Sequence, residues 1–181
     1  PIKNTSPYKK ILKENFFSNK IFFNRFLSLE AQVASISDDI AYNNHDLEDG
    51  LRAGLFSLKK FSSISSLSHT INKHLVNKKN YRKEIIINQI IRELINKMVI
   101  DVISTTNKNL KKIKPKSIND IYLQDYFVVN FSNKMKDSVS QIKDFLNINM
   151  YNNKKVIVNT NKGKKIIYDL YQHLSKKPKR Y

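Results

Sequence analysis

The sequence predicts an all-α protein, on three observations. Apolar residues recur at helical spacing along most of the chain, whereas the alternation typical of β-strands is scarce. Only three Gly and four Pro interrupt its 181 residues, and these residues commonly mark turns and the ends of elements. The length is sufficient for one domain, or two small ones, with a buried core.

The expected elements begin after an irregular, basic, Phe-rich lead-in over residues 1–27. A helix is expected over residues 28–49, and Gly50 and Gly54 stand near its end because glycine favours helix C-termini. Residues 55–80 are expected to hold a shorter helix followed by a Ser-rich connection.

The second half of the chain is expected to be dominated by longer helices. One should cover residues 81–106, where Ile, Leu, Met and Val recur at helical spacing. A Lys-rich connection with Pro115 follows over residues 111–116. Two more helices are expected over residues 132–151 and 162–174.

Two short segments are expected to lack helical structure. The valines around Val156–Val158 predict an extended linker, because β-branched residues favour extended backbone. The basic tail over residues 176–181 is expected to be disordered, as charged chain ends commonly are.

The composition narrows the class of protein. Without cysteine, the chain has no disulfide, thiolate zinc site or cysteine nucleophile, which fits a cytoplasmic location. No apolar run is long enough to span a membrane, so no membrane partner is expected. The sequence begins with Pro1 rather than Met, which leads us to expect a piece of a longer protein.

The formal net charge is +18, and nearly all of the 33 basic residues are Lys. Two explanations are open. Lys, Asn and Ile share A/T-rich codons, so the bias of a genome explains their abundance. A basic surface selected for an anionic partner such as nucleic acid is the other explanation, although such surfaces usually contain more Arg.

Acidic residues concentrate in one segment of this basic chain. On a helix, Asp38, Tyr42, Asp46 and Asp49 share one face. Six apolar residues share nearly the opposite face, which we expect to be buried: Leu29, Val33, Ile36, Ile40, Leu47 and Leu51. Carboxylate oxygens suit a divalent cation or a sugar hydroxyl. The same stripe also fits the solvated face of an amphipathic helix.

The spacing of the four histidines does not predict a metal site. His45 and Asp46 are adjacent, but neighbours on a helix point about 100° apart. His69 and His74 are expected to be polar surface residues. His173, in the last turn of the last helix, complements the helix dipole.

The region 28–54 contains three blocks, Leu-Glu-Ala-Gln at 29–32, Asp-Asp-Ile-Ala-Tyr at 38–42 and His-Asp-Leu-Glu-Asp-Gly-Leu-Arg-Ala-Gly at 45–54. It resembles the deoxyguanosinetriphosphate triphosphohydrolase family of the HD superfamily. Weaker similarity continues through Ile91–Asp101, Val129–Ser132, Phe145–Leu146 and Met150–Tyr151, and the first 27 residues lie outside it. The resemblance divides the chain into a lead-in over 1–27, the C-terminal part of an HD-type catalytic domain over 28–107, a C-terminal helical region over 108–175, and a tail over 176–181.

The resemblance implies that the intact enzyme converts a deoxynucleoside triphosphate and water into a deoxynucleoside and triphosphate. It implies a divalent metal, Mg²⁺ or Mn²⁺, held by a His, an adjacent His-Asp pair and a distant Asp. Asp38 matches that distant Asp. Tyr42 matches a tyrosine that lines the sugar pocket and discriminates deoxyribose from ribose, and Asp46 matches an acid that hydrogen-bonds the sugar hydroxyl.

Other residues of the motif have no assigned role: Asp39, His45, Asp49 and Arg52. The ordinary structural role of such residues is a helix cap, a salt bridge or a subunit contact. The remaining metal ligands of the family precede this block, yet residues 1–27 contain neither His nor Asp. We therefore expect no catalytic residue in this chain and no activity from it alone, whether it derives from a truncated, split or decayed gene.

The expected partners are the deoxynucleoside triphosphate and either further copies of the chain or the N-terminal half of the same enzyme. Two alternatives differ in class. One is a non-catalytic helical module that completes another chain. The other is weak binding of single-stranded nucleic acid through residues 108–116 and the tail.

Overall fold

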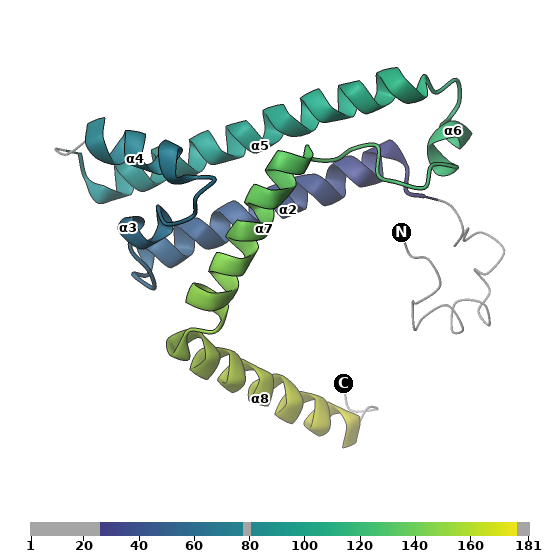
Figure 1. Cartoon of the computed structure of the whole chain (residues 1–181). Helices are drawn as coiled ribbons and strands as arrows, with labels where there is room; N and C mark the ends of the chain where they lie inside the picture. The colour runs from purple at the N-terminus through teal and green to yellow at the C-terminus, as the bar shows by residue number, and fades with distance from the viewer. Residues whose placement is uncertain (1–25, 78–80, 177–181) are drawn as a thin grey trace. The chain divides into compact units, whose positions relative to one another are not determined.

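A computed structural model describes residues 26–77 and 81–176, and every regular element within these ranges is helical (Figure 1). The all-α prediction is confirmed. The expectations for residues 1–25 and 177–181 lie outside the described residues. None of the helices in the described ranges is long and apolar enough to cross a membrane.

The chain divides into two compact units, each built from two stretches of sequence. The first contains residues 26–42 and 95–136, and the second contains residues 43–94 and 137–176 among the described residues. Helix α2 (Leu29–Arg52) supplies its first part to one unit and its second part to the other. Helix α5 (Lys83–Ile113) is shared in the same way, so the expected boundary between residues 107 and 108 falls inside a helix.

In the first unit, the start of α2 is capped locally. The hydroxyl of Ser28 accepts a hydrogen bond from the N–H of Ala31 at 3.3 Å. The pKa of the Glu30 carboxyl is lowered because it accepts hydrogen bonds from its own backbone N–H and from Ser28. A negative charge in the first turn also complements the helix dipole.

A buried glutamine joins α2 to a distant loop of the same unit. Gln32 is almost fully buried, and its Oε1 accepts hydrogen bonds from the N–H groups of Val128 and Val129 at 2.8 and 3.0 Å. Its Nε2 donates to the Leu27 carbonyl at 2.8 Å. Each buried polar atom is thereby satisfied, and the Gln of the Leu-Glu-Ala-Gln block serves the architecture of the unit.

The C-terminal end of α5 is followed by a residue in the left-handed backbone conformation. Lys114 has φ of 49° and its N–H donates to the Leu110 carbonyl at 2.8 Å, as in a left-handed C-cap. A short helix, α6 (Ile118–Tyr122), follows. The backbone N–H groups of Lys116 and Ser117 donate to Asp120 at 2.7 and 2.9 Å, which lowers the pKa of that carboxyl.

The second unit contains the remaining helices. They are α3 (Leu58–Phe61), α4 (Ser68–Asn77), α7 (Asn133–Leu146), the π-helical turn η2 (Asn147–Tyr151) and α8 (Lys154–Lys176). Helix α7 begins in the first unit, where the Asp101 carboxylate accepts from the N–H of Ser132 at 2.8 Å and from its hydroxyl at 2.7 Å. Its buried face then contributes Val139, Ile142, Phe145 and Leu146 to the core of the second unit.

Several element predictions need correction. Helix α5 continues past residue 106 to Ile113, so Lys111 and Lys112 form its last turn rather than a connection; cations are favourable at that end. The segment Val156–Val158 lies inside α8, since neighbouring helix formers outweigh the extended preference of three β-branched residues. Lys176, assigned to the tail, is also in α8.

Two short helices were absent from the prediction. Helix α4 follows the Ser-rich turns, and α6 follows Pro115. Both are short, and neither has the long apolar period that identifies a helix in sequence. Gly54 stands where expected, just after α2, with φ of 67°.

Candidate functional site

The acidic motif lies along α2, which is continuous from Leu29 to Arg52. Asp38 and Tyr42 belong to the part of α2 in the first unit and Asp46 to the part in the second. Asp38 is exposed, Tyr42 is 59% exposed and Asp46 is half-buried. Because the helix is unbroken, their spacing of four residues keeps them on one side of α2.

The opposite side of α2 is only partly buried. Ile40, Leu47 and Leu51 are buried as expected. The expectation is wrong for Val33, which is 49% exposed, while Leu29 and Ile36 are half-buried. Three polar residues of α2 are buried instead, and the apolar pattern gave no sign of them: Gln32, Asn43 and Asn44.

A close helix–loop contact fixes the second part of α2. A Cβ added to Gly50 would lie 2.3 Å from Cε1 of Phe56, so the motif glycine leaves room for this ring. Phe56 in turn packs edge-on against Phe145 of α7, with ring centroids 4.8 Å apart. The ring of Phe61 packs against the same Phe145 ring, with ring centroids 5.8 Å apart. The motif segment is thereby attached to α7 within one unit.

Tyr151, at the end of η2, reaches back to this segment. Its phenol O–H donates a hydrogen bond to Oδ2 of Asp46, 105 residues earlier in the chain. Sequence reasoning did not give Tyr151 a role; the only signal was the weak similarity of Met150–Tyr151. The pairing brings together a carboxylate and a phenol, two groups that recognise hydroxyls.

The π-helical turn that carries Tyr151 is held by asparagine side chains. The N–H of Asn152 bonds the Asn147 carbonyl at 3.0 Å, and its Nδ2 donates to the same carbonyl at 2.9 Å. The buried Asn149 donates from Nδ2 to the Phe145 carbonyl at 2.8 Å. Because π turns are rare and often lie at functional sites, the Asp46–Tyr151 pair is a candidate functional group.

The motif residues without an assigned role are mostly at the surface. Arg52 pairs with Glu48 at 2.7 Å, and its Nη2 donates to Oδ1 of Asn88 in α5 at 2.7 Å. Arg52 thus links two helices of the second unit. Asp39, His45 and Asp49 are exposed.

One histidine prediction is wrong. His74 is not a simple surface residue, because it is half-buried and its Nε2 lies 2.7 Å from Oε2 of Glu93. This contact joins α4 to α5, which lie side by side in Figure 1. His69 is exposed, as expected, and His173 lies in the last turn of α8.

The described residues do not supply a complete metal site. Nowhere in residues 26–77 and 81–176 do three or more His, Asp or Glu side chains come together as a metal would need. Asp38 offers one exposed carboxylate, and a catalytic divalent ion needs several ligands in fixed geometry. These residues therefore fit at most one side of a metal centre.

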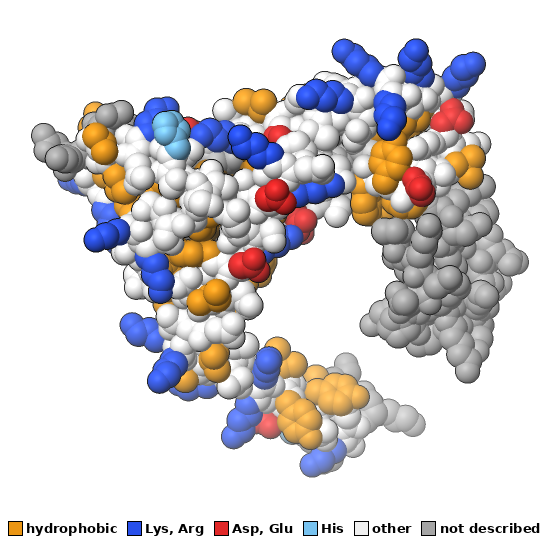
Figure 2. All heavy atoms as spheres, viewed as in Figure 1, with side chains coloured by type: hydrophobic (Ala, Val, Ile, Leu, Met, Phe, Trp, Pro, Cys, Tyr) orange, Lys and Arg blue, Asp and Glu red, His pale blue; other side chains and the backbone are white. Residues whose placement is uncertain are grey.

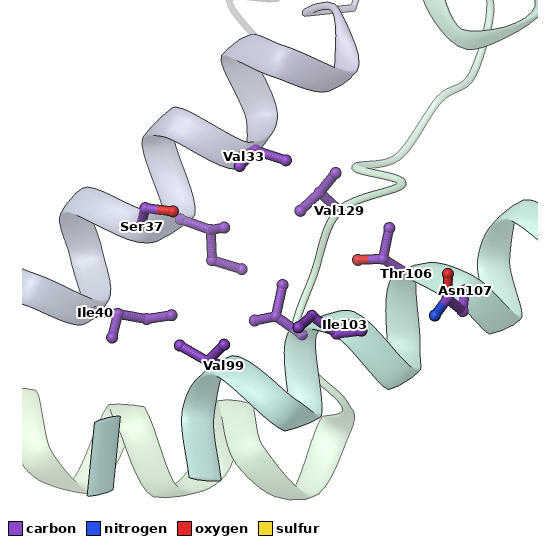
Figure 3. A pocket seen from close by; sticks show the side chains of 10 residues that line it. Val33, Ser37, Ile40, Val99, Ile103, Thr106, Asn107 and Val129 are labelled. Atoms are coloured by element: carbon purple, nitrogen blue, oxygen red, sulfur yellow. The ribbon is translucent and has the colours of Figure 1, made fainter. Parts of the chain in front are cut away.

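An apolar groove of about 350 Å³ lies in the first unit between α2 and the second part of α5. Figure 3 shows Val33 and Ile40 of α2 facing Val99 and Ile103 of α5 across it. Thr106 also lines the groove, and its buried hydroxyl has no hydrogen-bond partner among the described residues. Val33 and Ile103 are about half exposed, so this apolar surface is open.

Two comparisons with known proteins identify the class and then the family. A family described as the phosphohydrolase-associated domain matches residues 129–181, so the helical C-terminal region is of a type found in phosphohydrolases. A relative from Pelagibacter ubique, named deoxyguanosinetriphosphate triphosphohydrolase-like protein, is 44% identical over 99% of this chain. Proteins of the same name from Agrobacterium fabrum and Rickettsia typhi are 37% and 32% identical over 84% and 85% of the chain.

The chain belongs to the deoxyguanosinetriphosphate triphosphohydrolase-like family. It spans only part of these relatives: 48% of the Pelagibacter protein, 38% of the Agrobacterium protein and 40% of the Rickettsia protein. The expectation that residues 1–27 lie outside the similarity is wrong, because the Pelagibacter alignment includes 180 residues of this chain.

Proposed function

We propose that this chain forms one wall of the active site of a cytoplasmic, metal-dependent deoxynucleoside triphosphate triphosphohydrolase. The observation that carries the proposal is the side of α2 that presents Asp38, Tyr42 and Asp46 without burying any of them. The names of the relatives support the reaction class, and the phosphohydrolase-associated match supports a hydrolytic role. The reaction releases a deoxynucleoside and inorganic triphosphate.

Each residue has a distinct part in this proposal. Asp38 provides one carboxylate toward the Mg²⁺ or Mn²⁺ of the complete enzyme, which would supply Lewis-acid chemistry when bound. The exposed ring of Tyr42 packs against the deoxyribose and leaves no room for a ribose 2′-hydroxyl. Asp46 accepts a hydrogen bond from the 3′-hydroxyl, the only free hydroxyl on a deoxyribose 5′-triphosphate. These contacts position the substrate, which is itself a large contribution to rate.

The chain alone is proposed to be inactive, because the described residues fit at most one side of the metal centre. The complete polypeptide is therefore the right material for the test. Triphosphate release from dGTP should require Mg²⁺ or Mn²⁺ and should be abolished by Asp38→Asn.

Asp125→Asn is a matched control, since Asp125 is also an exposed aspartate of the first unit. It should retain full activity. Unchanged turnover in Asp38→Asn, or turnover that persists after chelation of divalent ions, would contradict the proposal.

A second candidate is a helical module that completes another polypeptide segment. Helix α8 favours it, because none of its 23 residues is buried within the described part of the chain. Val156, Ile167, Leu170 and Leu174 share one side of this helix by spacing, and Figure 2 shows apolar side chains exposed on α8. Large exposed apolar surfaces commonly mark interfaces.

The occupant we propose for these surfaces is the part of the relatives that this chain does not match, which is about half of the Pelagibacter protein. Co-expression of that part with the chain should yield a copurifying complex. If the chain instead forms oligomers that exclude the added part, the surfaces bind further copies. Nucleic-acid binding stays a weaker proposal. It would use the exposed lysines near the end of α5, which are Lys108, Lys111, Lys112, Lys114 and Lys116.

A further inference from the structure

The Asp46–Tyr151 pair has the properties of a positioned recognition group. The Tyr151 hydroxyl donates to one carboxylate oxygen of Asp46. A carboxylate offers about four lone-pair directions, so one phenol bond fixes its orientation without using up its capacity to accept another. Tyr151 is 36% exposed and Asp46 is half-buried, and a small hydroxyl-bearing ligand can therefore approach the pair.

Both partners are held by packing that is independent of their own bond. On one side, Leu47, which follows Asp46 in sequence, and Leu51 in the next turn of α2 are fully buried. On the other side, Phe145 contacts the rings of Phe56 and Phe61, and its carbonyl accepts a hydrogen bond from Nδ2 of Asn149 in η2. All of these residues belong to the second unit.

The π turn determines where the phenol points. In η2 the backbone bonds join residues five apart, as between Asn152 and Asn147, rather than four apart as in an α-helix. One extra residue is accommodated, which rotates every later side chain about the helix axis. Tyr151 is the last residue of this turn, so its direction toward Asp46 depends on the π geometry.

We propose that Tyr151 is a positioning residue that orients the Asp46 carboxylate to accept the hydrogen bond of the substrate 3′-hydroxyl. This inference rests on the proposed function, in which Asp46 binds that hydroxyl. Tyr151 acts through Asp46 and does not touch the reacting phosphate. Its contribution appears only with substrates that carry a 3′-hydroxyl, because only those use the oriented carboxylate.

The test compares dGTP with 2′,3′-dideoxy-GTP, which lacks the hydroxyl, in the complete enzyme with Mg²⁺ or Mn²⁺. Tyr151→Phe removes only the donor. It should lower kcat/KM for dGTP about tenfold and leave kcat/KM for the dideoxy analogue within about twofold. Tyr168→Phe in α8, a tyrosine 62% exposed, is the matched control and should change neither value.

Asp46→Asn tests the role of Asp46 separately from that of Tyr151. If it does not reduce the preference for dGTP over the dideoxy analogue, Asp46 does not read the 3′-hydroxyl, and both the role of Asp46 and that of Tyr151 are overturned. If it reduces the preference while Tyr151→Phe does not, only the positioning role of Tyr151 is overturned.

A double-mutant cycle distinguishes positioning from general damage to the fold. If Tyr151 acts through Asp46, Tyr151→Phe should cost no further activity in an Asp46→Asn background. Equal losses on both substrates, or additive losses in the double variant, would make Tyr151 a structural residue and end the proposal.

Discussion

The two halves of α2 carry one continuous motif but are packed differently. In the first half, residues 29–42, only Gln32 and Ile40 are buried among the described residues. In the second half, residues 43–52, five positions are buried: Asn43, Asn44, Leu47, Gly50 and Leu51. Within the described residues, the surroundings of Asp46 are therefore more closely packed than those of Asp38. A motif can thus be continuous in sequence while its halves depend on different partners.

The largest expected difference between the halves is in the cost of core truncation. Leu47→Ala should destabilise the chain by about 2–5 kcal/mol, because Leu47 is fully buried. Val33→Ala should change stability by less than about 0.5 kcal/mol, because Val33 is 49% exposed. Urea unfolding monitored by circular dichroism measures both. Equal costs would mean that the first half is covered as well as the second.

Gln32 is the one buried polar residue in the first half of α2 among the described residues, and it should behave like a core residue. Gln32→Ala leaves the N–H groups of Val128 and Val129 without their acceptor. Two unsatisfied buried donors should cost about 2–4 kcal/mol in total. Asn109→Ala, which removes a single bond to the Val128 carbonyl, should cost about 1 kcal/mol. The same unfolding curves test this, and a Gln32 variant no worse than the Asn109 variant would contradict it.

Gly50, in the second half of α2, should show a smaller effect than Leu47 or Gln32, and its substitution can be compared with that of a second helical glycine. Gly50→Ala brings a Cβ within 2.3 Å of Phe56, which should cost about 1–3 kcal/mol through displaced packing. Gly163 in α8 has nothing within 4 Å of such a Cβ. Gly163→Ala should therefore stabilise its helix by up to about 1 kcal/mol. Thermal unfolding should shift in opposite directions for the two variants; shifts in the same direction would refute the contact with Phe56.

The sequence predicted the features that depend on local periodicity. The period of Leu47 and Leu51 placed the buried side of α2 correctly in its second half, and the apolar repeat of α5 revealed a long helix. The same rule failed at Val33, because exposure depends on what covers a helix as well as on its pattern. A different rule failed for Val156–Val158, where the extended preference of β-branched residues gave way to the helix around them.

The candidate site was predictable only in part for a related reason. Asp38, Tyr42 and Asp46 follow from spacing within one helix, and their proposed roles follow from the family resemblance. Tyr151 does not, because its contact with Asp46 spans 105 residues. The burial of Gln32 could not be predicted either, because the N–H groups that it accepts from lie in a loop almost one hundred residues later. Long-range hydrogen bonds leave no periodic trace in a single sequence.

The π turn before α8 has a consequence for comparing this chain with other members of the family. Five residues, Asn147–Tyr151, occupy a turn that is one residue longer than its α-helical counterpart. A relative lacking one residue here would still place a tyrosine in the neighbouring alignment column, yet that tyrosine would be turned away from the acid. The two sequences would then agree across a gap one residue wide, although the hydrogen bond between the tyrosine and the aspartate was lost.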